Sequence, residues 1–364
     1  MSTWSDLSDL PVSIDGYDLS GLEQEMGPDF TRMCTFIRLH GGGEEGVGED
    51  VVYDALDHIA FQDEGEILDL TGPATLGELS ELMDALDLFP RSPPVRDEVS
   101  RNYRRWAFES AALDLALRQA GRPLGDAVAR APRPLSYVVS MRLPKPDPDG
   151  PESADRLHEL LTRYPSTRFK LDPTTTWTDA LIAELAATGA VDSLDLKGHY
   201  KGTPVDVVTD PDLYRRVAEA FPTAWLEDPD LSDPAAADAL AGEHDRITWD
   251  APIHSVADIE ALPFAPKTVN VKPSRLGGLR SLCAAYDYCE RQGIGAYGGG
   301  QTELGVGRDH IQYLAAVFHP ATPNEVAPRE FNHAQVPDGL PETPLDLPVA
   351  ATGFRFSRPG QGGS

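Results

Sequence analysis

The chain has 364 residues, which is enough for one large barrel domain and a smaller companion domain. Its formal net charge of −28 argues against nucleic acid as a partner, because phosphate binding needs a basic surface. It contains no apolar stretch of about 18 residues and no apolar leader, so we expect a cytoplasmic protein without membrane contact. Cys34, Cys283 and Cys289 lack metal-motif spacing and are expected to be buried thiols.

Residues 1–130 are predicted to form a separate α+β domain. The sequence at 35–39 alternates like a strand, and a triple-glycine turn leads to a hairpin-like return at 46–50. Residues 106–117 are strongly helical, and Gly121 is a typical stop for such a helix.

Residues 131–340 show alternating strand and helix patterns. The strand candidates are 136–142, 167–172, 191–197, 223–227, 246–250, 268–272, 294–299 and 324–328. Eight strands that alternate with helices favour a closed α/β barrel over an open sheet. The last segment, 341–364, is expected to return to the N-terminal domain.

A charged residue closes each of four successive strand candidates. Asp195 precedes Glu227 by 32 residues, Glu227 precedes Asp250 by 23, and Asp250 precedes Lys272 by 22. Each interval fits about one strand plus one helix, and the C-terminal ends of parallel strands meet at one mouth of a barrel. The four charges are therefore predicted to lie together.

Three carboxylates and a lysine at one barrel mouth favour a divalent-metal site with a nearby base. Carboxylate oxygens suit Mg²⁺, which commonly keeps substrate oxygens among its ligands. A cation there would stabilise the enediolate that forms when the carbon next to a carboxylate loses a proton. A single strand-end carboxylate is often only a helix cap or an ion-pair partner, but the ordered set favours the metal site.

Lysine is scarce in this acidic chain, which has six, and three of them end predicted inner strands. Lys272 is the leading candidate base, because a nearby metal ion and neighbouring lysines lower the pKa of an ammonium group. Lys170 is predicted to polarise the substrate carboxylate, and Lys197 lies at the end of the next strand.

Several motifs match one known family in order along the chain. They are the 35–49 hairpin, the helix 109–116, the carboxylates Asp195, Glu227 and Asp250, Lys272 within Asn270–Gly278, the segment 297–307, and Glu325. In these motifs the chain resembles the enolase superfamily, closest to its muconate-lactonizing and mandelate-racemase branches. The resemblance implies an α/β fold with an N-terminal α+β capping domain on a (β/α)₇β modified TIM barrel. It also implies one Mg²⁺ held by the three carboxylates, and Lys272 as the base of the sixth strand.

Two departures from the family pattern concern the second and third strands. The family usually has Lys-x-Lys and Asp-x-Asn, whereas this chain has Lys170-Leu-Asp172 and Asp195-Leu-Lys197. We therefore expect Asp172 and Lys197 to form an ion pair, with charged atoms within about 4 Å, as an exchanged version of the second position.

The predicted substrate is a small carboxylate, and the predicted reaction is an elimination, a cycloisomerisation or an epimerisation. An ammonia lyase acting on an amino acid and a non-catalytic carboxylate-binding protein remain alternatives. The resemblance places a substrate-specificity loop near residues 13–30, and a homo-oligomer is expected. The candidate substrate contacts are Tyr17, Gln301, Glu303 and Glu325.

Overall fold

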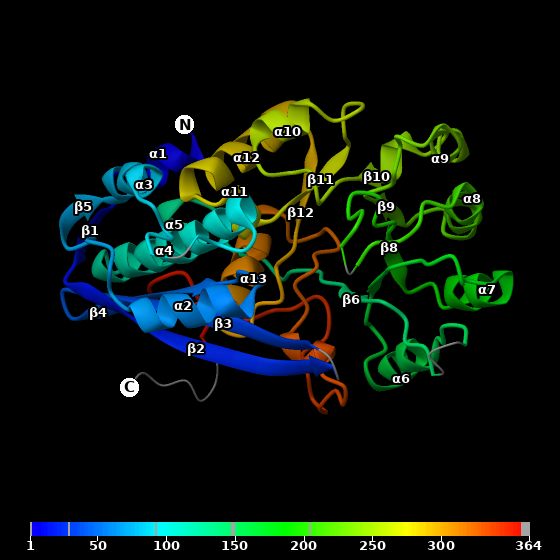
Figure 1. The fold of residues 1–364 in the computed structure, drawn as a ribbon, viewed down its shortest axis with the longest axis horizontal. Coiled ribbons are helices and arrows are strands. Elements are labelled where there is room, and N and C mark those ends of the chain that lie inside the picture. Colours follow the sequence, from blue (N-terminus) through cyan, green and yellow to red (C-terminus); the bar gives the residue numbers. More distant parts are fainter. Residues whose placement is uncertain (1, 28–29, 92, 147–149, 204, 358–364) are drawn as a thin grey trace.

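The computed structural model describes residues 2–27, 30–91, 93–146, 150–203 and 205–357. An N-terminal α+β unit, the capping domain, lies against one side of a ring of parallel strands (Figure 1). No helix among these residues has the length and apolar character to cross a membrane.

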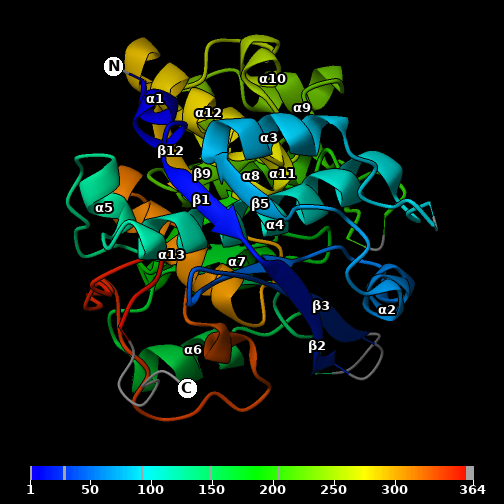
Figure 2. The same cartoon turned by 90° about the vertical axis from the view of Figure 1, so that its left-hand side faces the viewer.

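The capping domain is built on a three-stranded antiparallel sheet that packs against one long helix. Its elements are α1 (Thr3–Leu7), β1 (Pro11–Ile14), β2 (Gly16–Gly27), β3 (Phe30–Gly41), β4 (Glu44–Asp50), α2 (Ala55–Glu64), β5 (Gly72–Thr75), α3 (Leu76–Ala85), α4 (Asp97–Gln119) and α5 (Leu124–Ala127). Strand β3 pairs with β2 on one side and β4 on the other. Figure 2 shows these blue strands in front of the barrel elements.

Two glycines of β4 let the sheet approach α4 closely. A Cβ on Gly46 would lie 2.2 Å from the Ala111 carbonyl oxygen, and one on Gly48 would lie 1.9 Å from the Ala107 carbonyl oxygen. Any side chain at these two positions would push the sheet away from the helix. The predicted hairpin and helix are both confirmed, and the helix is longer than expected.

The expectation of a loop near residues 13–30 is wrong for most of that segment. Residues 16–27 form β2, which pairs with β3 along almost its whole length. The backbone polar groups of β2 that face β3 are paired in this ladder, which holds the segment as an edge strand. Residues 28 and 29 lie outside the described part of the chain.

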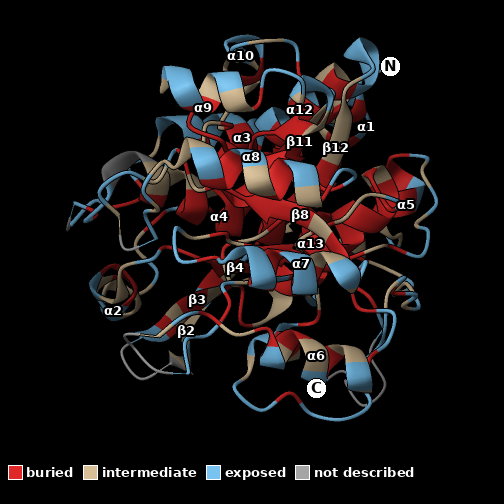
Figure 3. Cartoon of the chain, turned by 90° about the vertical axis from the view of Figure 1, so that its right-hand side faces the viewer, coloured by how far each residue is buried: buried red, intermediate tan, exposed pale blue. Residues whose placement is uncertain are grey.

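The second unit alternates strands with helices. Its elements are β6 (Val139–Met141), α6 (Asp155–Arg163), β7 (Phe169–Leu171), α7 (Asp179–Ala187), β8 (Val191–Asp195), α8 (Pro211–Ala220), β9 (Trp225–Glu227), α9 (Pro234–Ala239), a 3₁₀ turn (His244–Arg246), β10 (Ile247–Thr248), α10 (Val256–Glu260), β11 (Thr268–Val271), α11 (Pro273–Leu276), α12 (Leu279–Gln292), β12 (Gly295–Gly298), α13 (Val306–Phe318) and a second 3₁₀ turn (Arg329–Asn332). Figure 3 shows buried strands at the centre and helices with exposed outer faces around them.

The strands form two parallel ladders that single links join into a ring. One sheet has the order β6-β7-β8-β9-β10, and β11 pairs with β12. The links are the hydrogen bond from Asn270 N to Trp249 O (2.9 Å) and the parallel bridges Gly299–Glu325 and Tyr137–Asn324. Seven of the predicted strands are confirmed. The eighth, at 324–328, is reduced to these two bridges.

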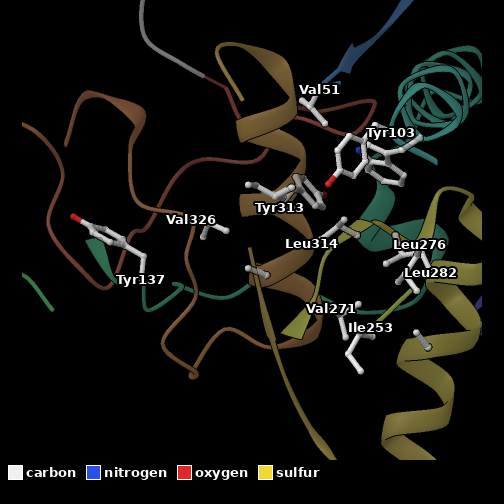
Figure 4. Close-up of a cluster of buried hydrophobic side chains, with 14 of the residues drawn as sticks. Val51, Tyr103, Tyr137, Ile253, Val271, Leu276, Leu282, Tyr313, Leu314 and Val326 are labelled. Atoms are coloured by element: carbon white, nitrogen blue, oxygen red, sulfur yellow. The ribbon is translucent and has the colours of Figure 1, made fainter. Parts of the chain in front are cut away.

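One hydrophobic core spans both units. Figure 4 shows Val51 and Tyr103 of the capping domain in the same cluster as Leu314 of α13 and Val271 of β11, and all four are buried. The chain's last part also returns to the capping domain, where Phe354 N donates to Asp114 Oδ1 of α4 (2.8 Å). These contacts fix the capping domain over the barrel. Residues 358–364 lie outside the described part.

Candidate active site

The carboxylates predicted at the strand ends lie side by side at the C-terminal end of the barrel. Asp195 is the last residue of β8 and is the register partner of Glu227, the last residue of β9. Asp250 follows β10 by two residues. All three are almost fully buried, and buried carboxylates need positive partners to remain ionised.

Asp228 belongs to the same cluster, although the sequence analysis did not single it out. One oxygen each of Asp195, Glu227 and Asp228 lies within 4.8 Å of the others, so these atoms could hold a metal ion. Asp228 adopts a positive φ of 49°, and its carboxylate accepts hydrogen bonds from the backbone of Asp250 and Ala251, both at 2.9 Å. Asp228 therefore also shapes the turn that carries Asp250.

Asp250 faces basic and hydroxyl groups. Its carboxylate accepts hydrogen bonds from Lys272 Nζ (2.8 Å), Arg275 (2.8 Å) and the hydroxyl of Tyr200 (3.2 Å). Although burial raises the pKa of a carboxyl, Arg275 and Lys272 hold the pKa of Asp250 well below its usual range. Its carboxylate is thus ionised and held beside Lys272.

Lys170 lies at the centre of the carboxylates. Its Nζ is 3.0 Å from Asp195 Oδ2 and also contacts Glu227 and Glu325. Burial favours the neutral amine, but Asp195 and Glu227 outweigh it and raise the pKa of Lys170. Lys170 is therefore a fixed positive charge.

The exchanged pair of the second and third strands is present. Lys197 Nζ lies 3.5 Å from Asp172 Oδ1 and 2.5 Å from Asp195 Oδ2. The predicted ion pair is confirmed, with the addition that Lys197 is shared between two carboxylates. Against the effect of burial, Asp195 and Asp172 raise the pKa of Lys197.

Lys272 differs from the other two lysines. It follows β11, and its Nζ contacts Asp250 (2.8 Å) and Glu325 (3.4 Å). Burial lowers the pKa of Lys272, and the positive charges of Arg275 and Lys170 lower it further against the attraction of Asp250. The backbone approaches it closely, because a Cβ on Gly299 would lie 2.5 Å from Lys272 Cε.

The acidic and basic groups of this cluster are unequal in number. The carboxyl groups are Asp172, Asp195, Glu227, Asp228, Asp250 and Glu325, and the basic groups are Lys170, Lys197, Lys272, Arg275 and the more exposed Arg142, which lies 3.9 Å from Asp172. The carboxyl groups therefore outnumber the basic groups. Burial raises the pKa of Glu227 to about 8, as expected for a carboxyl that lacks enough positive charge nearby. The donor set fits one divalent cation.

The predicted substrate contacts do not all lie at the charged cluster. Tyr17 is buried within the capping domain, where its hydroxyl accepts hydrogen bonds from Ile67 N (2.9 Å) and Leu68 N (3.1 Å). Glu303 accepts a hydrogen bond from the backbone of Gln301 (2.7 Å) in the segment after β12. Glu325 joins Lys170 to Lys272, as described above.

Sequence reasoning missed several aromatic and basic residues of the site. Arg275 lies one helical turn after Lys272, in α11, and that spacing is a signal that could have found it. Tyr200 comes from the loop after β8, and Tyr297 of β12 donates from its hydroxyl to Glu227. Tyr53 follows β4 of the capping domain, and its hydroxyl donates to Gln301 Oε1 (2.6 Å).

Solved structures share this architecture. A dipeptide epimerase from Methylococcus capsulatus, complexed with Mg ion, has a TM-score of 0.64 at 18% identity, covering 88% of this chain and 92% of that chain. A muconate cycloisomerase from Pseudomonas fluorescens has a TM-score of 0.61 at 18% identity, covering 87% of each chain. At these identities the likeness establishes the fold.

Sequence relatives are o-succinylbenzoate synthases. That of Geobacillus stearothermophilus is 27% identical over 235 residues, and that of Geobacillus kaustophilus is 25% identical over 240 residues. Each match covers 62% of this chain and 59% of the relative, so the chain spans less than two thirds of the length of these relatives.

The capped barrel and these similarities confirm the resemblance to the enolase superfamily seen in the sequence. The chain belongs to the family described as Domain of unknown function (DUF8230). The sequence model of that family's N-terminal domain matches residues 5–127, and that of its C-terminal domain matches residues 131–333.

Proposed function

We propose that this protein is a Mg²⁺-dependent lyase or isomerase that removes the α-proton of a small carboxylate substrate. The observation that carries the proposal is the cluster of buried carboxyl groups at the ends of β8, β9 and β10, directly beside Lys272. Burying so many charged groups is costly for the fold, so a cluster of this kind marks a binding site rather than a stabilising feature.

Asp195, Glu227 and Asp250 are the proposed metal ligands. Asp228, rather than Asp250, has an oxygen within 4.8 Å of those of Asp195 and Glu227. Both oxygens of Asp228, however, already accept backbone hydrogen bonds that hold the turn. Asp250 is held by side chains of Lys272, Arg275 and Tyr200, which can rearrange more readily than a backbone turn. A bound Mg²⁺ would supply positive charge next to the enediolate form of the substrate.

Lys272 is the proposed base. Its Nζ would receive the α-proton, and the contacts with Asp250 and Glu325 orient the ammonium group that results. Lys170 stays charged between Asp195, Glu227 and Glu325, where it would attract the substrate carboxylate. The barrel buries all of these groups, and exclusion of water strengthens their electrostatic effect.

The opposite side of the site decides between an isomerase and a lyase. Asp172 follows β7 and Lys197 follows β8. Strands β9 and β10 lie between β8 and β11, the strand that Lys272 follows. Both charges of this pair are committed to ion pairs, so a second base for epimerisation would have to come from a released Lys197. This favours elimination or cycloisomerisation, which need one proton-transferring group at the α-carbon.

Proton exchange tests the proposal. The similar proteins are named for dipeptides, muconate and o-succinylbenzoate, so these compounds, with acid sugars and amino acids, form the first panel. In deuterated buffer with Mg²⁺, proton NMR should show loss of the α-proton signal of at least one compound, and a chelator should stop it. Mg²⁺-dependent binding of these acids without exchange would show a non-catalytic carboxylate-binding protein, and ammonia release from an amino acid would identify an ammonia lyase.

A further inference from the structure

The segment after β12 presents a buried amide group with one unused hydrogen-bonding atom. Gln301 is 3% exposed, and its Oε1 accepts the hydroxyl of Tyr53 at 2.6 Å. Its Nε2 is buried and has no hydrogen-bond partner among the residues that the structure describes. Leaving a buried donor unpaired destabilises a fold, so such a donor is commonly kept for a ligand.

The backbone around this amide is held by a buried cation. The guanidinium of Arg32 donates to the carbonyl oxygens of Val51 (2.7 Å) and Val52 (2.6 Å) in the capping domain. It also donates to those of Gln301 (3.0 Å) and Thr302 (3.3 Å). Arg32 therefore ties the segment that carries Tyr53 to the segment that carries Gln301.

The conformation of the segment is itself unusual. Thr302 has a φ of 60°, which lies in the left-handed region of backbone conformation. Residues other than glycine and asparagine rarely adopt this region. A Cβ on Gly300 would lie 2.1 Å from Glu303 Oε2, so a side chain before Gln301 would displace the Glu303 carboxylate. Strain of this kind persists where the surrounding structure imposes it, and it clusters at ligand sites.

Gln301 lies close to Lys272 along the chain that follows β12. It comes two residues after Gly299, whose backbone approaches the Lys272 side chain so closely that a Cβ there would lie 2.5 Å from Lys272 Cε. The Tyr53 hydroxyl that holds it interacts electrostatically with Asp250 and Arg275 of the charged cluster. A substrate anchored at the cluster would therefore extend toward Gln301.

We propose that Gln301 is a specificity residue whose Nε2 donates a hydrogen bond to an uncharged carbonyl oxygen on the part of the substrate remote from the reacting carbon. The inference rests on the proposed function and names a substrate class for it: carboxylic acids with a ketone or amide group. Tyr53 positions the amide by holding its oxygen.

The surroundings of Gln301 favour an uncharged acceptor over a second carboxylate. Glu303 accepts from the Gln301 backbone and lies 3.4 Å from its cationic partner, Arg308. The carboxylate of Glu49, from β4 of the capping domain, is buried against this segment, where it accepts hydrogen bonds from Leu304 N, Gly305 N (3.0 Å) and Gly307 N (2.8 Å). Arg32 and Arg308 balance the two carboxylates, so the neutral donor lies where no net positive charge would attract a second anion.

Binding of matched small acids to the full-length protein with Mg²⁺ tests this role. The probes are oxo acids with the ketone three to five carbons from the carboxyl group, such as 4-oxopentanoate, each paired with the alkanoate of equal length. Calorimetry should show at least one oxo acid binding about tenfold more tightly than its alkanoate. Gln301→Leu should remove that preference, and Tyr53→Phe should reduce it, with alkanoate affinity unchanged in both.

Gln62→Leu is the matched control, because it removes a glutamine hydrogen bond to Thr35 inside the capping domain (2.8 Å). It should leave the preference intact, and the melting temperature of each variant reports folding. Equal affinities for every pair in the wild type, or an unchanged preference in Gln301→Leu, would overturn the role of Gln301 alone. Failure of both acids of every pair to bind with Mg²⁺ would refute the proposed function and this inference with it.

Discussion

Strands β7 and β8 carry an ion pair at each end, and the two pairs are used differently. At the N-terminal end, Arg168 pairs with Asp192, and the two side chains are 39% and 28% exposed. At the C-terminal end, Asp172 pairs with Lys197, and these side chains are 13% and 14% exposed. The first pair stands alone, whereas the second adjoins a cluster in which carboxyl groups outnumber basic groups.

The comparison shows that a hollow by itself does not mark the reactive end of the barrel. A pocket of about 480 Å³ opens at the N-terminal end, where Tyr137, Arg168 and Trp225 are among its lining residues. A pocket of about 510 Å³ lies near the other end and is lined by residues such as Lys201 and Asp230, without any member of the charged cluster. The accumulation of buried charged groups, not the volume, distinguishes the candidate site.

The largest expected effect is the loss of proton exchange in Lys272→Ala, and Lys267, at the other end of β11, supplies the control. Lys272→Ala should lower the rate of α-proton exchange by about 10³-fold, as expected for loss of a general base. Lys267→Ala removes a lysine at the opposite end of the strand, where the side chain is 65% exposed, and should leave the rate unchanged. Exchange is measured by proton NMR in deuterated buffer. Equal rates in Lys272→Ala and wild type would move the base to Lys170 or Lys197.

The second effect concerns the two aspartates of β8. Asp195→Asn should weaken Mg²⁺ binding by at least about 100-fold, because it removes a charged ligand. Asp192→Asn alters the same strand at its other end and should leave the metal affinity unchanged. Titration calorimetry with the metal alone measures both. A similar affinity in the two variants would place the ion elsewhere.

The positions of these residues could be predicted because strand ends follow from the sequence rhythm. Asp195, Glu227 and Lys272 each close an apolar run, and alternation along a strand decides which side chains face inward. The orientation of Asp228 and Arg275 could not be predicted, since it depends on a positive φ and on the short helix α11.

The capping domain was harder to predict than the barrel. The family resemblance implied a loop near residues 13–30, but residues 16–27 pair with β3 as a strand. The eighth strand was overestimated for the opposite reason, because Glu325 and Asn324 make only single bridges to their neighbours. In both cases tertiary pairing, which no local pattern contains, decides the outcome.

The third expected effect is a pH dependence of stability that arises from His319, at the N-terminal end of the barrel, and not from the candidate active site. Burial lowers the pKa of His319, next to Asn324, from its usual 6.5 to about 4. Between pH 6.5 and 4 the unfolded chain binds a proton that the folded chain does not, so stability falls as the pH falls. This group alone should make the protein about 2 kcal/mol less stable at pH 5 than at pH 7.

Denaturant unfolding of His319→Gln measures that contribution. The variant should lose this part of the pH dependence and keep its exchange activity at neutral pH, whereas His158→Gln, at an exposed histidine, should behave like the wild type. An unchanged pH dependence in His319→Gln would show that His319 takes up its proton in the folded protein as readily as in the unfolded chain.

The smallest effect returns to the two ion pairs of β7 and β8. Asp172→Asn leaves Lys197 with Asp195 as its remaining anionic partner, so the ammonium group should shift toward the metal ligand. We expect a tenfold fall in exchange rate, which corresponds to about 1.4 kcal/mol in the activation free energy, with stability nearly unchanged. Asp192→Asn should leave the exchange rate unchanged and slightly lower the free energy of unfolding. It removes a half-exposed ion pair worth less than about 1 kcal/mol. If both variants changed only the unfolding free energy, the Asp172–Lys197 pair would be structural, and Lys272 would act without help from the second and third strands.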